Sequence, residues 1–368
     1  MTRATALLEL HQKRGTPTVE WDQVAVARSF SHPGEEWLAL RSAAGLLDLG
    51  FRGWLEVTGE DRVRFLHGMV SNDVKALSPG QGCAALLLDV QGHVLADLRI
   101  FAETDRVFLE TRLSLVERVL KTLEHYIIMD QVELADKSEA VSTIGLEGPA
   151  TPEIVRSLLH LELEAMLAFG HASFSLEGIR GGLMRVSNCG FPGVEFVVER
   201  SRAAELWNIL LDALGPGRPV GFEALNVLRV EAGIPWYGCE VDDRTLPQEA
   251  GLETTAVSFT KGCYVGQEIV ERIRSRGEVH RTLAGLILSS LDEPATATLS
   301  SSSSRPGTPL FFKGKEVGRI SSVVHSFALE RSIALAILRR EANQPGTMLT
   351  FNGGGSAEVT SLPFVKLA

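Results

Sequence analysis

A segment without apolar periodicity, Asp292 to Pro309 (DEPATATLSSSSSRPGTP), places the strongest constraint on how this chain of 368 residues can fold. It is rich in Ser, Thr and Pro, which is typical of a flexible loop or linker. Short apolar runs separated by glycines follow it, at residues 309–312, 316–320, 332–338, 348–351 and 358–362. Such spacing predicts a small antiparallel β-barrel or sandwich. The segment therefore either links a β domain to the rest of the chain or is a loop inserted in a domain surface.

The residues before this segment mix helices and strands. Thr151-Pro152-Glu153 predicts the start of one helix, and Ser201 predicts the N-cap of another. Apolar spacing predicts two further helices and three strands, of which the last two form a hairpin: helices over 113–123 and 222–233, and strands over 54–57, 83–90 and 94–101. The body of the protein is therefore expected to contain both α and β structure.

Composition and charge exclude several classes of protein. Hydrophobic residues make up 45% of the chain, but no stretch approaches the roughly 18 apolar residues that a membrane span needs. The first residues lack the pattern of a signal peptide, so we expect a cytoplasmic protein. A net charge of −10 argues against a protein that binds nucleic acid through a basic surface. Four scattered cysteines form no CxxC pair, so we expect neither a disulfide framework nor a bound metal: Cys83, Cys189, Cys239 and Cys263.

The densest group of chemically useful residues is the segment Lys261 to Glu268, KGCYVGQE. Its two glycines indicate a tight backbone course around Cys263 and Tyr264. If Lys261 and the following arginines lie close in space, they would lower the pKa of the Cys263 thiol and make it reactive. The alternative is that Cys263 is an inert small apolar residue.

KGCYVGQE resembles the signature of the YgfZ-type folate-binding proteins, a branch of the superfamily of the glycine-cleavage T-protein, an aminomethyltransferase. The resemblance extends from about Asp48 to Phe364. The opening segment LDLGFRGWLEVTGEDRVRFLHGMVSNDV carries the family's Asn-Asp pair at Asn72, and VQGHVLADLRIF carries the counterpart of its catalytic aspartate at Asp97. RVEAGIPWYGCEVDDRTLPQEAGL resembles the central motif, with Glu231 in the position of the pterin-binding glutamate.

The resemblance implies an α+β fold in which two intertwined lobes and a C-terminal antiparallel β-barrel domain surround a central funnel. The expected body spans 1–282, with lobe one at about 1–50 and 140–245 and lobe two at about 51–139 and 246–282. The expected barrel domain spans 283–368 and contains the loop 292–309.

Two of the expected binding residues also have a physical rationale. A pterin ring presents an N–H and an amino group on one edge, and a carboxylate such as that of Glu231 can accept from both, although an exposed helical glutamate is the alternative. Asp97 lies in the apolar run VLADLRI, where a carboxylate is costly unless it is paired or used. Asp97 also shares one side of a strand with Arg99, so an acid on a solvent-facing side is the alternative.

One departure from the family pattern affects the expected pocket. The segment Gly190-Phe191-Pro192-Gly193-Val194-Glu195 is shorter than its T-protein counterpart. Glu195 matches the last glutamate of that counterpart, but another family glutamate is missing. The pocket for aminomethyl transfer is therefore expected to be incomplete.

The resemblance assigns the following residues to the site. The catalytic group is Cys263, Asp97 and Lys261, and the folate-binding group is Glu231, Asp97, Asn72, Glu195, Tyr237 and Arg272. Tyr237 either stacks on a flat ring or packs in the core. Arg272 belongs to a basic run that ends at Arg281, whose alternating spacing predicts three arginines on one side of an extended segment. These arginines either bind an anion such as the folate polyglutamate tail or remain solvated.

The function implied by the resemblance is tetrahydrofolate binding in support of the assembly or repair of iron–sulfur clusters in client enzymes. The expected partners are folate and iron–sulfur client or assembly proteins. One alternative is an aminomethyltransferase of glycine cleavage, with Asp97 as catalytic group and a lipoyl carrier protein as partner. A folate-dependent demethylase is another. Cys263 in its motif favours the first hypothesis, and the shortened segment before Glu195 counts against the second.

Overall fold

The computed structural model describes residues 2–277, 279–289, 306–351 and 354–366, and its internal contacts divide the chain into two units. Unit 1 comprises Met1–Leu88, Leu95–Leu225 and Thr255–Val265, and unit 2 comprises Asp89–Val94, Asn226–Thr254 and Gly266–Ala368. Most of the predicted linker, residues 292–305, lies outside the described residues. Residues 226–254 and 266–282 belong to the same unit as the C-terminal strands, and the predicted domain bounds stay a prediction.

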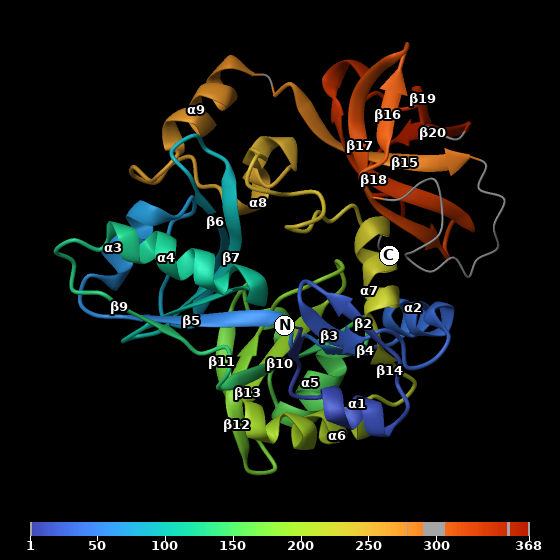
Figure 1. The fold of residues 1–368 in the computed structure, drawn as a ribbon. Helices are drawn as coiled ribbons and strands as arrows, with labels where there is room; N and C mark the ends of the chain where they lie inside the picture. Colours follow the sequence, from blue (N-terminus) through green and yellow to red (C-terminus); the bar gives the residue numbers. More distant parts are fainter. Residues whose placement is uncertain (1, 278, 290–305, 352–353, 367–368) are drawn as a thin grey trace. The chain divides into compact units, whose positions relative to one another are not determined.

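The first sheet of unit 1 has six strands and carries one face of a large hydrophobic core; its strands are labelled in Figure 1. Along its third strand Val194, Phe196 and Val198 pack in one core with residues of the helices α5 (Thr151–Leu159) and α6 (Ala203–Ala213). Because alternate residues of a strand lie on opposite faces, Glu195 and Val197 lie on the other face of this sheet. The strands in order are β11 (His171–Leu176), β12 (Ile179–Met184), β13 (Gly193–Glu199), β10 (Val141–Glu147), β4 (Gly45–Asp48) and β14 (Arg218–Val220).

The second sheet of unit 1 has five strands and lies against the face of the first sheet that carries Glu195. The indole Nε1 of Trp54 donates to Thr143 Oγ1 across the two sheets at 2.8 Å, and Trp54 packs with Phe101, Met184 and Val186. Polar and apolar side chains therefore share the layer between the sheets. The strands in order are β6 (Gln81–Leu88), β7 (Val94–Ala102), β8 (Val107–Arg112), β5 (Arg52–Thr58) and β9 (Glu133–Asp136).

A small third sheet lies at the start of unit 1. Its central strand β3 pairs in parallel with β1 and antiparallel with β2. The strands are β1 (Arg3–Ala4), β2 (Thr18–Trp21) and β3 (Val24–Ala27).

The C-terminal part of unit 2 is a closed antiparallel barrel, as predicted. Four of the five expected apolar runs lie in strands, of which those at 316–320 and 332–338 are parts of longer strands, and the run at 358–362 extends two residues beyond the end of β20. A sixth strand, β15, precedes the predicted linker and closes the barrel by pairing with β18 and β20. In order around the barrel the strands are β15 (Arg281–Ser289), β18 (Arg331–Arg339), β17 (Lys315–Ser326), β16 (Pro309–Phe312), β19 (Met348–Phe351) and β20 (Gly355–Thr360).

The helices that the sequence patterns predict are present, but two of them have a different N-cap from the one expected. Ala150 rather than Thr151 is the N-cap of α5, and Ser201 lies in a 3₁₀ turn ahead of α6, whose N-cap is Arg202. The turn continues directly into the helix, so no side chain is needed as a cap. The helices are α1 (Leu8–Lys13), α2 (Pro33–Ser42), α3 (Arg62–Met69), α4 (Val116–Tyr126), α5 (Thr151–Leu159), α6 (Ala203–Ala213), α7 (Phe222–Glu231), α8 (Glu253–Ala256) and α9 (Gln267–Arg276). Short 3₁₀ turns lie at Leu113–Leu115, Leu163–Ala165, Arg200–Arg202, Pro247–Glu249 and Arg340–Ala342.

The prediction of an extended basic segment is wrong, because residues 267–276 form α9. Gly266 and Gly277 flank this helix with φ values of 82° and 81°, which only glycine adopts at little cost. Positions two apart on a helix point about 200° from each other, so Arg272 and Arg274 do not share a face. Within the described part of the chain, no helix is both long and apolar enough to cross a membrane.

Candidate functional site

The candidate site of unit 1 lies in the layer between its two large sheets. Asp97 and Arg99 are two residues apart on β7, so their side chains lie on the same face, about 7 Å apart along the strand. Arg99 pairs in register with Glu110 of β8, and Glu195 reaches the same place from β13. The sequence folds in this way because the opposite residues of these strands, such as Leu98 and Phe196, are apolar and buried.

Arg99 joins the two sheets through charge-assisted hydrogen bonds. Its Nη1 donates to Glu195 Oε1 at 2.7 Å and to Glu110 Oε2 at 3.1 Å, and its Nη2 donates to Asn188 Oδ1 at 2.9 Å. Arg52 adds a second guanidinium, 3.0 Å from Glu110 Oε1. The two carboxylates are fully buried, so this group of two cations and two anions is stable only as a neutral set.

The two buried carboxyls respond differently to this environment. Burial raises the pKa of Glu110 to about 7, although Arg99 opposes the effect. Burial acts in the same direction on Glu195, but the charges of Arg99 and Arg52 outweigh it and hold the pKa of Glu195 below its ordinary value. Glu195 therefore remains an anion at neutral pH, and Glu110 is the member of the cluster that takes up a proton first.

Two carboxylate oxygens in this layer have no hydrogen-bond partner among the described residues, although both are buried. They are Asp97 Oδ1 and Glu195 Oε2. Buried polar atoms are almost always paired, and an unpaired carboxylate oxygen in a neutral network is therefore suited to accept from a ligand. This geometry brings two of the predicted site residues, Asp97 and Glu195, onto facing strands of one layer.

Lys261 and Asn72 lie together elsewhere in unit 1 and bond mainly to main-chain groups. The Lys261 ammonium donates to the carbonyls of His67 and Val70 at 2.5 Å and of Asn72 at 3.0 Å, and thereby caps the C-terminal end of α3. Burial lowers the pKa of Lys261 to about 8. Asn72 Nδ2 donates to the carbonyl of Ala84 at 2.7 Å. These contacts account for both residues as parts of the scaffold, and the predicted catalytic and binding roles stay predictions.

Cys83 and Cys263 differ in environment. Cys263 is exposed. Cys83 is partly buried on β6, and burial raises the pKa of its thiol to about 12. Of these two thiols, Cys263 is therefore the one open to chemistry.

The remaining predicted residues belong to unit 2. Glu231 is 2% exposed, so it is not the exposed helical glutamate of the alternative hypothesis, and its Oε1 accepts from Ser326 Oγ of the barrel at 2.6 Å. Tyr237 is buried in the segment after α7. Arg272 is paired with Glu268 one turn earlier on α9, at 2.8 Å. The structure does not bring these three residues into one cluster.

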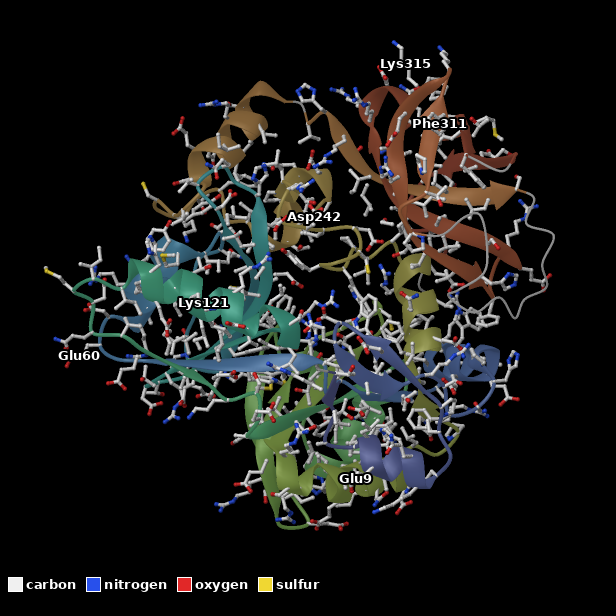
Figure 2. The ribbon with its side chains drawn as sticks, in the orientation of Figure 1. Glu9, Glu60, Lys121, Asp242, Phe311 and Lys315 are labelled. Atoms are coloured by element: carbon white, nitrogen blue, oxygen red, sulfur yellow. The ribbon has the colours of Figure 1, made fainter. Side chains whose placement is uncertain are left out.

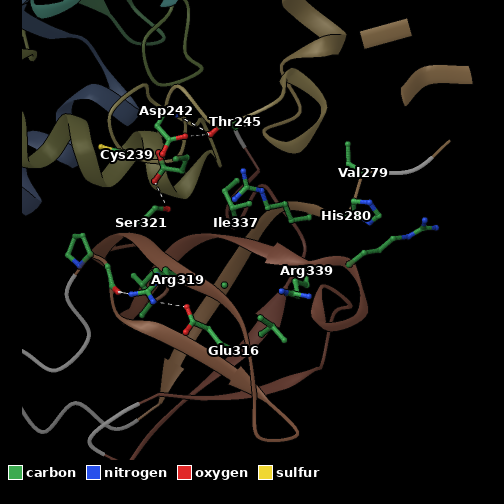
Figure 3. Close-up of a pocket in the computed structure, with 18 of the residues that line it drawn as sticks. Cys239, Asp242, Thr245, Val279, His280, Glu316, Arg319, Ser321, Ile337 and Arg339 are labelled. Carbon is green, nitrogen blue, oxygen red and sulfur yellow. Dashed lines mark hydrogen bonds and ion pairs between the residues drawn. The ribbon is translucent and has the colours of Figure 1, made fainter. Parts of the chain in front are cut away.

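Unit 2 also contains an open cavity of about 1470 Å³ beside the barrel (Figure 3). Its walls come from the loop after α7, where Asp242 lies (Figure 2), and from β17 and β18. Several of its polar groups are already paired, as Arg319 is with Glu316 at 2.8 Å and Asp242 with Thr245. None of the predicted site residues lines this cavity. Within the described residues no group of His, Cys, Asp and Glu side chains could hold a metal ion.

Sequence reasoning missed the residues that position the site: Arg52, Glu110 and Asn188. Glu110 left a readable signal, because it follows Val107 and Leu109 on a strand that pairs with the one carrying Asp97 and Arg99. Charged residues at matching positions of two apolar strands indicate a buried ion pair. Asn188 left none, since it lies in the loop between β12 and β13, where no strand or helix period applies.

The fold is similar to that of the glycine cleavage system aminomethyltransferase T of Bartonella henselae, with a TM-score of 0.87 and 21% identity, covering 100% of this chain and 99% of that one. Residues 7–261 match the GCVT N-terminal domain model, and residues 293–366 match the glycine cleavage T-protein C-terminal barrel domain model. The chain belongs to the glycine cleavage T-protein family.

Three curated relatives are named aminomethyltransferase. The aminomethyltransferase of Chlorobium luteolum is 30% identical over 373 residues, which cover 99% of each chain. That of Geobacillus sp. is 27% identical over 378 residues and all of both chains, and that of Bacillus subtilis is 26% identical over 374 residues. These matches support the superfamily inferred from the motifs. They give no support to the narrower YgfZ-type assignment or to iron–sulfur partners, and they favour the hypothesis that was the alternative.

Proposed function

We propose that this protein is a tetrahydrofolate-dependent aminomethyltransferase that works with a lipoyl carrier protein. The observation that carries the proposal is the pair of buried, unpartnered carboxylate oxygens, Asp97 Oδ1 and Glu195 Oε2, in one layer of unit 1. Family membership and the names of the relatives support it.

The residues of this layer fit the pterin part of tetrahydrofolate. Glu195 remains ionised and keeps one free oxygen, so it can accept hydrogen bonds from the N–H groups of the pterin edge. We assign this role to Glu195 rather than to Glu231, because the carboxylate of Glu231 already accepts from Ser326. When bound, tetrahydrofolate supplies the amine nitrogens that accept the one-carbon unit.

The chain's own groups then have distinct tasks. Arg99 and Asn188 hold the Glu195 carboxylate in one orientation from two sides, since both donate to Oε1. Asp97 lies two residues before Arg99 on the same face of β7, and its free Oδ1 can orient the folate and hold a proton during transfer. The main-chain carbonyl of Asp97 accepts a hydrogen bond from Thr111 Oγ1 at 2.8 Å.

The experiment is a pair of measurements on the purified full chain. Calorimetry measures tetrahydrofolate binding, and a transfer assay measures methylenetetrahydrofolate formed from an aminomethyl-loaded lipoyl carrier protein. Wild-type protein should bind and turn over, Glu195→Gln should bind folate less tightly, and Asp97→Asn should bind folate but turn over slowly. Folate binding without any turnover by the wild type would reject aminomethyl transfer and leave folate binding standing.

A second candidate function is the support of iron–sulfur enzymes that the KGCYVGQE motif implies. It is favoured by the exposed thiol of Cys263 in that motif and by the shortened segment that ends at Glu195. Complementation of a strain that lacks its own YgfZ-type protein would test it. Rescue by the wild type but not by Cys263→Ser would favour this function, and rescue by neither form would exclude it.

A further inference from the structure

The layer between the sheets of unit 1 contains a second region, separate from the Asp97 and Glu195 site. It is an open cavity of about 370 Å³. Trp54 and Met184 separate it from the charged cluster, since each belongs to the compact group that they form with Phe101 and Val186. Residues two apart on the same strands face the two regions: Glu110 faces the cluster and Phe108 the cavity, and Glu195 faces the cluster and Val197 the cavity.

The walls of this cavity are mainly apolar. Phe108, Val141 and Val197 are only partly buried and turn apolar surface toward it. Trp54 is held by its bond to Thr143 and packs edge-on to Phe108, with ring centroids 6.5 Å apart. A volume of this size with rigid aromatic walls is typical of a small-molecule site.

A glycine keeps the cavity open. Gly182 lies in the middle of β12 with ordinary extended backbone, and a Cβ built on it would meet only the flexible end of Met184, at 3.0 Å. Backbone geometry therefore does not require glycine at this position. A strand interior normally favours a β-branched or aromatic residue, so the missing side chain leaves room for something else.

The two carboxylates at the rim of the cavity, Glu56 and Glu103, differ in how far their charges are compensated. Glu56 is bound by Lys137 at 2.9 Å and by Arg106 at 2.5 Å, and Arg106 also pairs with Asp105 at 2.9 Å, so these two cations and two anions balance. Among the described residues, the Glu103 side chain pairs with His171 Nε2 alone, at 3.1 Å, and burial lowers the pKa of that imidazole, which is therefore neutral at pH 7. Glu103 is 41% exposed, and its Oε2 accepts no hydrogen bond from the described residues. The rim therefore carries one uncompensated negative charge.

We propose that this cavity is a binding site for a small aromatic amine, with its ring between Phe108, Val197 and Gly182 and its ammonium group at Glu103. Apolar contact supplies most of the affinity, and the carboxylate selects cations over neutral or anionic analogues. The proposal is independent of the folate function, because no residue of the Asp97 and Glu195 site lines the cavity.

Three probes of the same ring test the proposal by titration calorimetry on the full chain: tryptamine, indole and indole-3-acetate. Tryptamine should bind most tightly and indole-3-acetate least. Glu103→Gln should weaken tryptamine by about three- to tenfold, because Glu103 is partly exposed, and should leave indole unchanged. Asp97→Asn should leave all three unchanged, which separates this site from the folate site.

Filling the cavity gives the decisive comparison. Gly182→Leu should abolish tryptamine binding while folate binding persists. If Gly182→Leu does not fold, Ser173→Phe at the mouth of the cavity serves instead, with Ser175→Phe, two residues along the same strand and outside the cavity, as the matched control. No saturable binding of tryptamine to the wild type, or unchanged binding to the folded filled variant, would overturn the proposal.

Discussion

Arg99→Met tests whether the buried charges of unit 1 form one neutral set. Arg99 donates to Glu195, Glu110 and Asn188, and only Arg52 would remain opposite two fully buried carboxylates. Removing one partner of a buried ion pair costs about 3–5 kcal/mol. With about 2–4 °C lost per kcal/mol, the melting temperature should fall by roughly 6–20 °C.

The loss should depend on pH in a defined direction. The pKa of Glu110 is raised to about 7 from an ordinary 4.5. A carboxyl that holds its proton more tightly when folded makes stability fall as pH rises from about 4.5 to about 7. Arg99 opposes this rise in pKa, so its removal extends the falling range above pH 7. Arg99→Met should therefore be more destabilised relative to wild type at pH 8 than at pH 6.

Chemical denaturation followed by circular dichroism at both pH values measures the effect. Arg202→Met, which removes an exposed partner of Glu205, is the control and should change little. The double variant Arg99→Met with Glu110→Gln restores a neutral set of Arg52 and Glu195, so it should regain much of the lost stability. If the two substitutions instead lower the free energy of unfolding additively, the two carboxylates do not belong to one neutral set and the reasoning fails.

Three further predictions concern residues outside this group of buried charges. Asp97→Asn should lower the rate of aminomethyl transfer about 10²-fold or more while folate affinity stays within a few-fold, and unchanged turnover would remove Asp97 from the chemistry. Glu231→Gln weakens the bond from Ser326 and should lower stability by about 1–2 kcal/mol in thermal unfolding without changing folate affinity; a weaker affinity would return Glu231 to the binding site. Iodoacetamide at pH 7 with peptide mapping should label Cys263 well before Cys83, and the reverse order would contradict the raised pKa of Cys83.

The sequence predicted those features that depend on local spacing. The apolar runs after Pro309 predicted the barrel strands, and the periodicity over 113–123 predicted α4, because strand and helix periods are properties of neighbouring residues. The arginines of α9 were misread because a two-residue spacing among charges was weighed above the helical spacing of Val270 and Ile273 and the flanking glycines.

The candidate site was predictable only in part for a related reason. Asp97 and Glu195 could be named through their motifs, but their meeting depends on which faces of two sheets lie together. The bond from Arg99 to Glu195 joins residues that are far apart in the chain, and no local pattern encodes it. Lys261 illustrates the converse. Its place in a motif suggested chemistry, whereas its three carbonyl partners come from the end of α3 and the turn after it, which are distant in the chain.

Closure of the barrel by β15 has a consequence for how the protein folds and how it aggregates. β15 pairs with β20, so that Gly285 lies opposite Thr360, and neither strand is left with unpaired backbone groups on an open edge. This contact joins distant parts of the chain, and closing so long a loop is slow. Until it forms, β15 and β20 both present free edges to other chains. Variants that weaken this one pairing should therefore promote aggregation during refolding more than they lower the stability of the finished molecule.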